Sequence, residues 1–564
     1  MTRRAGDAPS GLSAEAAVVA RSSLVNLAAM VAGAALSFGL TVLVSRWLQP
    51  GGAGALFELI ALFTIMSQTF ELGADTGLTR WISRARAIGG LADARRVLVI
   101  ALVPVATIGI AAAAAAWVAA PELARIFLHG MAARAGAADI RIVAPLVPLG
   151  ALSFCLVDAA RGFGRMWPYL AIEGLGKPVA RIGLVFAALL AGLGLRGALV
   201  AWGLPVVAGL VAAWLIVARI LSKEVPVRSG ASTSAKHHAG AEGPFAPEVP
   251  ASRGHGRGER GRHRASARRA AGRVRQLSIE FWSFTAPRGL QATFQVVILW
   301  LDILLVGAMV SRYAAGVYAA VSKLAIVGTF VLEGNRLAIG PQLSAFLARR
   351  EHDRAADLYQ SATRWLMLAS WPLYIVFAVF PAVILGIFGS RYTAGAAALA
   401  VLSGAMLVNL GTGNVTVVLL MGGKSSWSAI NAGAALVVNI GLNLVLLPHI
   451  GILGAAVAWA ASIVVDNVTA MIEIRWVLGL APFGPGYLLA AATTVGCFGV
   501  TGIVARILLG ETLPALAAAL AVGLAAFGTA LYLARAPLQL AGISEVLRLR
   551  ATPAAASHVG KQAA

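Results

Sequence analysis

The chain has 564 residues, of which 59% are hydrophobic and only 12% are charged. Because soluble domains carry roughly a quarter charged residues, this composition excludes an ordinary soluble protein. Apolar stretches of about 20 residues recur along the chain, long enough for a helix to cross a hydrocarbon core roughly 30 Å thick. These stretches are too uniformly apolar for the alternating strands of a membrane β-barrel. In such a protein, the meaning of the net charge of +22 depends on where the Lys and Arg residues fall.

The hydropathy pattern predicts an all-α polytopic membrane protein with about fourteen membrane helices. Residues 1–21 are polar, and the apolar run after them is too long for a cleavable signal, so we expect the first membrane helix there. In chain order, the predicted helices span 22–45, 54–78, 97–120, 140–160, 168–193, 197–221, 279–308, 315–343, 365–388, 395–421, 428–447, 453–473, 487–508 and 513–533.

The positions of the 46 Lys and Arg residues indicate the orientation. With the N-terminus placed inside, most of them fall in the inside segments, and this bias does not depend on the long basic insertion at 222–276. The positive-inside rule therefore predicts that both termini lie in the cytoplasm. We expect a multi-pass protein of the bacterial cytoplasmic (inner) membrane.

Residues 222–276 are rich in Gly, Pro, Ser, Arg and His. Such a composition cannot bury a core, and it predicts a disordered basic cytoplasmic linker. Two interpretations stay open. The linker is either simply solvated, or it binds anionic membrane lipids or an acidic partner through its charge. The composition argues against nucleic-acid binding, because Phe245 is the sole Phe, Trp or Tyr among the basic residues of this segment.

The two sides of this linker resemble each other. Gly197 and Trp202 recur as Gly454 and Trp459, and Gly54 and Glu71 recur at a constant offset as Gly316 and Glu333. We therefore predict two parallel six-helix repeats, which is a recurring transporter design. The expected division is a cytoplasmic tail at 1–21, a bundle at 22–221, the linker at 222–276, a second bundle at 277–475, two further helices within 476–533, and a cytoplasmic tail at 534–564.

Several motifs in the two predicted bundles resemble those of a known family. This family is the polysaccharide flippases, which include lipopolysaccharide and O-antigen-type exporters, of the multidrug/oligosaccharidyl-lipid/polysaccharide exporter superfamily. The motifs are RWLQPGGAG at 46–54, ELGADTGLTR at 71–80, SRYTAGA at 390–396, LMGGK at 420–424 and NIGLNLVLLPHIGILGAA at 439–456. The resemblance implies a central cavity between helices 1, 2, 7 and 8 of the predicted set. The long basic insertion departs from the family pattern.

Cations inside membrane helices are costly, and they mark candidate functional positions. If the substrate is a lipid-linked sugar, such cations are candidates to bind its pyrophosphate, Arg through paired N–H donors and Lys as a point charge. Arg288 ranks first, because it lies roughly 14 Å into its helix and has no acid three or four residues away, and Lys323 ranks second. The predicted substrate-binding cations are Arg288, Lys323, Arg336, Lys177 and Arg181.

The membrane acids are candidates for coupling to an ion or for pairing with these cations. Spacing along a helix allows structural pairs of Glu173 with Lys177 and of Glu333 with Arg336. Asp302 and Lys323 could pair between adjacent helices. The predicted coupling or pairing acids are Asp302, Glu333, Asp75, Glu71 and Asp158.

The sequence thus favours a flippase that moves polyprenyl-pyrophosphate-linked oligosaccharide, or a related anionic glycolipid, from the inner to the outer leaflet by alternating access for cell-surface polysaccharide biosynthesis. Its expected partners are this substrate and the glycosyltransferases or polymerase of the same pathway. We expect no enzyme activity, cofactor or metal, because no His cluster or phosphate-binding Gly-Lys-Ser loop has the required spacing. One alternative is a multidrug or cation antiporter of the same superfamily, which the absence of an acid from 22–45 disfavours. Another is a non-transport scaffold of an envelope-biosynthesis complex.

Overall fold

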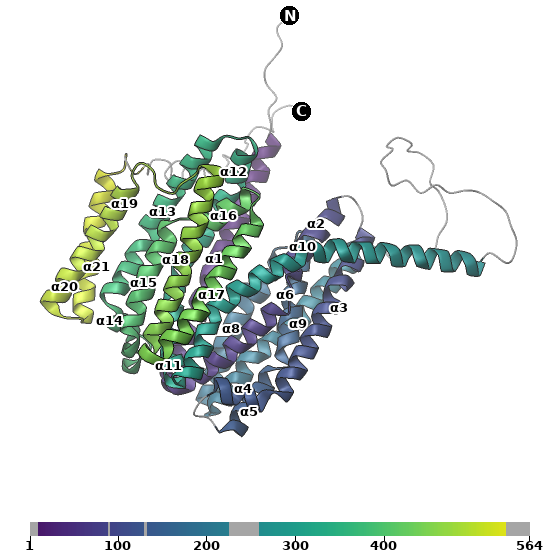
Figure 1. Ribbon diagram of the computed structural model, residues 1–564, viewed down its shortest axis with the longest axis horizontal. Helices are drawn as coiled ribbons and strands as arrows, with labels where there is room; N and C mark the ends of the chain where they lie inside the picture. The colour runs from purple at the N-terminus through teal and green to yellow at the C-terminus, as the bar shows by residue number, and fades with distance from the viewer. Residues whose placement is uncertain (1–9, 88–90, 129–131, 225–258, 537, 539–564) are drawn as a thin grey trace, which may run out of the picture.

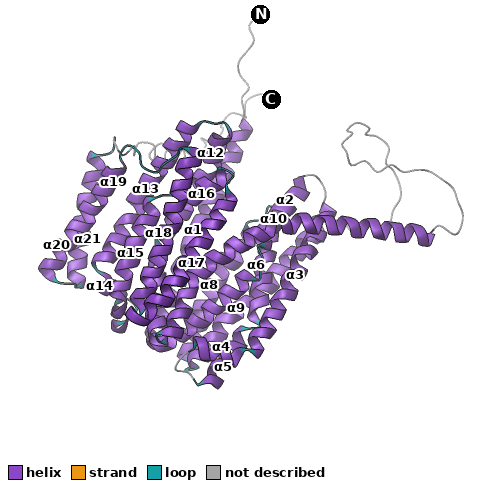
Figure 2. Cartoon of the chain, viewed as in Figure 1, coloured by secondary structure: helices purple, strands orange, loops and turns teal. Residues whose placement is uncertain are grey.

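The computed structural model describes residues 10–87, 91–128, 132–224, 259–536 and 538. Every regular element among these residues is a helix (Figure 2), so the predicted all-α class is confirmed. The first half comprises α1 (Ser10–Thr69), α2 (Ala74–Ala87), α3 (Leu91–Val118), α4 (Ala120–Phe127), α5 (Ala133–Val143), α6 (Leu146–Gly162), α7 (Trp167–Tyr169), the π-helix η1 (Leu170–Gly176), α8 (Lys177–Leu190) and α9 (Gly194–Glu224).

The second half begins with a long helix that enters the molecule from outside the bundle (Figure 1). It comprises α10 (Glu259–Met309), α11 (Arg312–Val327), α12 (Thr329–Ala348), α13 (His352–Val379), α14 (Pro381–Leu385), the 3₁₀-helix η2 (Ser390–Gly395), α15 (Ala396–Gly411), α16 (Val415–Met421), α17 (Ser425–Ile450), α18 (Ile452–Leu478), α19 (Tyr487–Thr494), the π-helix η3 (Val495–Val500), α20 (Thr501–Leu509) and α21 (Leu513–Leu533).

The chain is a multi-pass membrane protein: its described residues contain twelve helical segments that are long and apolar enough to span a bilayer. One of them, Val31–Arg86, is 56 residues long and passes through a kink at Gln49, where φ is 56°. The predicted helix 168–193 corresponds to α7, η1 and α8 and is not among the twelve. The count of fourteen stays a prediction.

Several of the predicted membrane helices are broken in the structure, and three of these breaks lie well inside the predicted spans. The predicted helix 54–78 is interrupted between Thr69 and Ala74, 315–343 is interrupted at Gly328, and 395–421 between Gly411 and Val415. Hydropathy misses such breaks, because the residues around them remain apolar while distant side chains satisfy the freed backbone groups.

Two tyrosine hydroxyls of α13 satisfy the freed groups at two of these breaks. Tyr374 donates to the Ala325 carbonyl at 2.6 Å and accepts a hydrogen bond from the Gly328 amide at 2.9 Å. Tyr359 donates to the Thr412 carbonyl at 2.6 Å. Both tyrosines are fully buried, so the breaks are held by packed tertiary contacts.

The ends of the polar segments also differ from expectation. The linker was expected to be disordered over 222–276, but α9 continues to Glu224 and α10 begins at Glu259. Likewise, α1 begins at Ser10 within the predicted tail 1–21. Ala, Arg and Gln residues favour helix, and the adjoining membrane helix removes the cost of nucleation. Residues 225–258, 1–9 and most of the predicted tail 534–564 lie outside the described residues.

The glycines that recur between the two halves meet each other where α1 crosses α11. A Cβ on Gly54 would lie 1.9 Å from the Arg312 carbonyl oxygen, and one on Gly316 would lie 2.0 Å from the Pro50 carbonyl oxygen. This contact is reciprocal, since Pro50 and Gly54 match Arg312 and Gly316 at the offset of the repeat. Two-fold related units make such contacts. In Figure 1, α3, α6 and α9 gather on one side and α13, α15 and α21 on the other.

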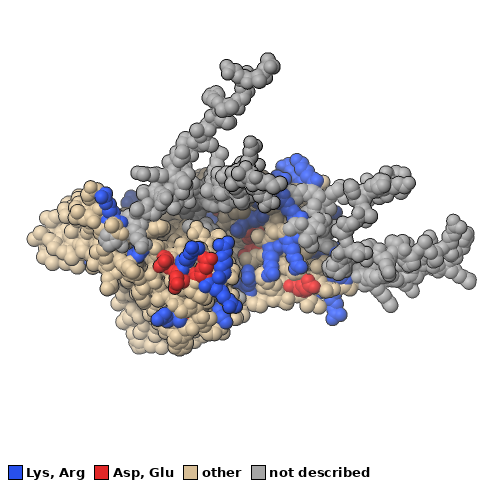
Figure 3. All heavy atoms as spheres, turned by 90° about the horizontal axis from the view of Figure 1, so that it is seen from above, with Lys and Arg blue, Asp and Glu red and all other residues tan. Residues whose placement is uncertain are grey.

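The end of the molecule near α2 and α12 is basic. Figure 3 views this end, and Lys and Arg cover more of its visible surface than Asp and Glu. The last turn of α2, for example, carries Arg84 and Arg86. Such a face is typical of the cytoplasmic side of a membrane protein.

Candidate functional site

Two adjoining cavities lie between the two halves of the chain. The smaller has a volume of about 250 Å³ and is lined from α1, α6, η1, α8, α9, α10 and α11. The larger has a volume of about 580 Å³ and extends along α1, η1, α11 and α12. Ser37, Glu173, Pro178 and Lys323 line both cavities. The two spaces are therefore neighbours, and both halves contribute to their walls.

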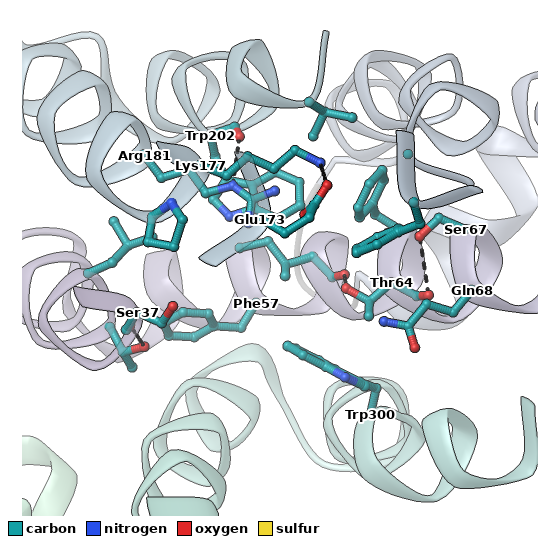
Figure 4. Close-up of a pocket in the computed structure, with 18 of the residues that line it drawn as sticks. Ser37, Phe57, Thr64, Ser67, Gln68, Glu173, Lys177, Arg181, Trp202 and Trp300 are labelled. Atoms are coloured by element: carbon teal, nitrogen blue, oxygen red, sulfur yellow. Dashed lines mark hydrogen bonds and ion pairs between the residues drawn. The ribbon is translucent and has the colours of Figure 1, made fainter. Parts of the chain in front are cut away.

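Cations from both halves line the smaller cavity. Arg181 donates from Nε to the Trp202 carbonyl at 3.3 Å, and its guanidinium lies 4.2 Å from the centre of the Trp202 ring. Figure 4 shows Arg181, Lys177 and Glu173 on one wall, with Trp300 on the opposite side. Three cations, Lys177, Arg181 and Lys323, face one acid, Glu173, among the described residues that line this space.

Lys323 is the cation at the junction of the two cavities. Its ammonium lies 4.5 Å from the centre of the Trp300 ring, at a distance where the aromatic face attracts a positive charge. Within the described part of the chain, this ammonium makes no hydrogen bond or ion pair. A partly buried cation with only an aromatic partner is available to bind an anionic ligand.

Apart from Lys323, the cations that line the larger cavity are already paired with acids. Arg336 is 2.7 Å from Glu333, as the spacing on the helix predicts, and these side chains are 51% and 42% exposed. Arg161, which was not among the predicted site residues, is 2.6 Å from Asp158, and its guanidinium lies 5.1 Å from the Tyr169 ring centre. The positive charge available to a ligand is thus concentrated in the smaller cavity.

The predicted pair of Asp302 and Lys323 does not form. Asp302 is buried and accepts hydrogen bonds from the Tyr318 hydroxyl at 2.9 Å and from Asn443 Nδ2 at 2.8 Å. Polar groups of α11 and α17 thus satisfy this carboxylate, and Lys323 turns to Trp300 instead. The sequence places both residues in neighbouring helices, but it does not show which faces meet.

The first-ranked cation, Arg288, is not among the residues that line either cavity. Its exposed guanidinium lies 4.2 Å from the centre of the Phe284 ring, and Arg80 lies 3.8 Å from the centre of the same ring. The next residue, Gly289, packs on the break after α1, where its Cβ would lie 2.5 Å from the Leu72 carbonyl carbon. The depth of Arg288 along its helix could be predicted from the sequence. Its direction could not, because the contact between Gly289 and the break after α1 turns the neighbouring Arg288 away from the cavities.

The structure brings together three of the predicted acids, Glu71, Asp75 and Asp158. Their carboxylate oxygens lie within 4.8 Å of one another, with Glu71 in the break after α1, Asp75 on α2 and Asp158 on α6. Oxygen ligands of this kind suit hard cations, although Arg161 already neutralises Asp158. The sequence singled out these acids individually and gave no sign that they meet.

Sequence reasoning missed the two tryptophans that hold the cavity cations. Trp202 was recognised only as part of the repeat, and Trp300 not at all. Glu58 was also absent from the predicted set, although its carboxylate is fully buried and accepts no hydrogen bond within the described residues. An aromatic residue next to a cation on another helix leaves no pattern in the sequence, since contacts between helices have no fixed spacing.

No protein-family model matches the chain. Part of it is similar to the probable low-salt glycan biosynthesis flippase Agl15 of Haloferax volcanii, with 27% identity over 177 residues. This match covers 30% of the chain and 36% of the relative, so the chain spans only about a third of that relative's length.

The fold is similar to that of solved transporters over most of the chain. The lipid II flippase MurJ in an inward closed conformation gives a TM-score of 0.63 at 11% identity, covering 90% of this chain and 98% of MurJ. An inward-facing multidrug resistance MATE family transporter gives a TM-score of 0.56 at 14% identity, covering 81% and 94%. The chain therefore shares its fold with these solved transporters, and the resemblance to flippases that the motifs indicate is confirmed as a similarity to one flippase in sequence and to another in fold.

Proposed function

We propose that this chain is a flippase for a polyprenyl-pyrophosphate-linked oligosaccharide or a related anionic glycolipid. It moves this substrate from the inner to the outer leaflet by alternating access, for cell-surface polysaccharide biosynthesis. One observation carries the proposal: Lys323, a cation without an acidic partner among the described residues, lines both cavities between the two halves. The similarity to a glycan biosynthesis flippase and to MurJ supports the same conclusion.

The charge of the smaller cavity fits an anionic headgroup. A cation in a membrane-embedded site is costly unless an anion or water stabilises it, and Lys323 lacks a carboxylate partner within the described residues. Arg181 contributes a second positive charge without an ion pair in that part of the chain. A pyrophosphate would satisfy both cations, while the guanidinium N–H groups and the ammonium donate to its oxygens.

The rest of the cavity wall fits the sugar. Five polar side chains of α1 line this space, and each can donate or accept hydrogen bonds with hydroxyl groups. Aromatic rings such as Phe57 and Trp202 line the same space and supply apolar surface. The five polar residues are Ser37, Thr41, Thr64, Ser67 and Gln68.

The arrangement of the two halves supports alternating access. We propose that the repeats 22–221 and 277–475 act as the two bundles, which rock about the Gly54–Gly316 contact. The basic end of the molecule supports termini in the cytoplasm and a location in the bacterial inner membrane. Glycosyltransferases or a polymerase would supply or consume the substrate, and the basic segment 222–276 would attract anionic lipids.

A multidrug or cation antiporter is the second candidate, because MATE transporters share the fold. The cavity charge argues against it. The smaller cavity exposes Lys177, Arg181 and Lys323 against Glu173 alone among its described lining residues, and such a wall repels cationic drugs.

A vesicle assay tests the proposal. The full chain is reconstituted in liposomes that carry a fluorescent polyprenyl-pyrophosphate-linked oligosaccharide, and its transfer between leaflets is followed by quenching from one side. We expect the protein to accelerate this transfer and to leave a cationic dye gradient unchanged. Transport of the dye without transfer of the glycolipid would instead support the antiporter.

A further inference from the structure

A buried ion pair lies on the wall of the smaller cavity. Lys177 Nζ is paired with Glu173 Oε1 and donates to the Ser153 hydroxyl at 3.1 Å. The Ser153 hydroxyl in turn donates to Glu173 Oε1 at 3.2 Å. The Lys177 and Glu173 side chains are 5% and 9% exposed, yet both residues line the cavity (Figure 4).

The local structure is built to hold this pair. Glu173 lies in the π-helix η1, and Lys177 is the first residue of α8 directly after it. π-Helical turns are rare and often occur at functional sites. The lysine stem fits against α9 because residue 209 is a glycine, where a Cβ would lie 2.5 Å from Lys177 Cε.

We propose that Glu173 is an internal counter-anion, which occupies Lys177 in the empty carrier and is displaced from it by the phosphate of the substrate. This inference rests on the proposed flippase function. An unpaired ammonium at the position of Lys177 would be strongly destabilising, so an empty carrier needs an anion there. Among the described residues that line the smaller cavity, Glu173 is the sole carboxylate.

A displaced Glu173 has a second environment within reach. Glu173 also lines the larger cavity, whose wall includes Arg161 and Arg336. The phosphate of a bound substrate would attract Lys177 together with Arg181 and Lys323. The Glu173 carboxylate would then move toward the larger cavity. When the substrate leaves, Glu173 returns to Lys177, so the buried ammonium has an anion in both states. Competition of this kind weakens binding and favours release of the substrate.

Binding of inorganic pyrophosphate to the purified full-length protein tests the competition, measured by isothermal titration calorimetry. Glu173→Gln should raise the affinity at least about tenfold, because close charge pairs are coupled by more than about 1.4 kcal/mol. The control is Glu122→Gln, which removes an acid from an exposed pair with Arg125 outside both cavities and should leave the affinity unchanged.

A double variant separates this role from a structural one. If Glu173 acts through Lys177, the gain in pyrophosphate affinity should depend on Lys177. The double variant Glu173→Gln/Lys177→Gln should then bind pyrophosphate no better than Lys177→Gln alone. The double variant also contains no unpaired charge at the site of the buried pair. The inference is overturned if Glu173→Gln binds pyrophosphate no better than wild type, or if the gain persists without Lys177. Neither result affects the proposed function as long as the wild type transfers the glycolipid. A wild type that transfers no glycolipid and binds no pyrophosphate would refute the proposed function itself.

Discussion

Replacement of Lys323 by glutamine is the sharpest test of the cavity. The ammonium lines both cavities and has only the Trp300 ring as a partner among the described residues, so the variant removes a charge without leaving an acid unpaired. We expect folding stability to be unchanged. A hydrogen bond between charged groups contributes about 2 kcal/mol, so the affinity for pyrophosphate should fall roughly thirtyfold.

The assay combines calorimetry of pyrophosphate binding with transfer of the fluorescent glycolipid in vesicles. Lys323→Arg keeps the charge and should retain part of both activities. Arg288→Gln is the matched control, since it removes one positive charge at a residue outside both cavities. Equal losses in Lys323→Gln and Arg288→Gln, or wild-type affinity in Lys323→Gln, would show that the reasoning from the cavity is wrong.

Three further predictions concern the packing of the helices and the basic segment between the two halves. Gly54→Ala should sharply reduce the yield of folded protein, because its Cβ would lie 1.9 Å from a backbone carbonyl oxygen. The same change at Gly51, where a Cβ would have no neighbour within 4 Å, should be tolerated. Equal yields of the two variants in size-exclusion chromatography would contradict this. Asp302→Ala should lower the free energy of unfolding by about 2 kcal/mol, because the buried Tyr318 hydroxyl loses its hydrogen-bond acceptor. An unchanged midpoint of thermal unfolding in detergent would refute this prediction. Deletion of residues 225–258 should leave glycolipid transfer within about twofold of wild type, because the described walls of both cavities are built from helices on either side of this segment. Loss of transfer with intact folding would instead favour a non-transport scaffold function for the basic segment.

Interactions along a single helix were readable from the sequence. Glu173 with Lys177, and Glu333 with Arg336, form the pairs that their spacing allows. Hydropathy likewise identified the membrane segments, because the burial of one helix in lipid depends on its own composition. The glycines that recur between the two halves, such as Gly54 and Gly316, were also visible in the sequence, because two helix backbones can approach this closely only where glycine is present.

Tertiary packing decided which of the membrane charges meet. Arg288 and Lys323 are both cations within apolar stretches. The packing of α10 on the break after α1 places Arg288 outside the cavities, whereas α11 places Lys323 at their junction. The partners of Asp302 and the gathering of Glu71 with Asp158 also come from different helices. The sequence alone determined the membrane class, the repeat and the list of candidate charges. The structure decided which of them share a cavity, because the rotation of one helix against another is set by contacts between residues far apart in the chain.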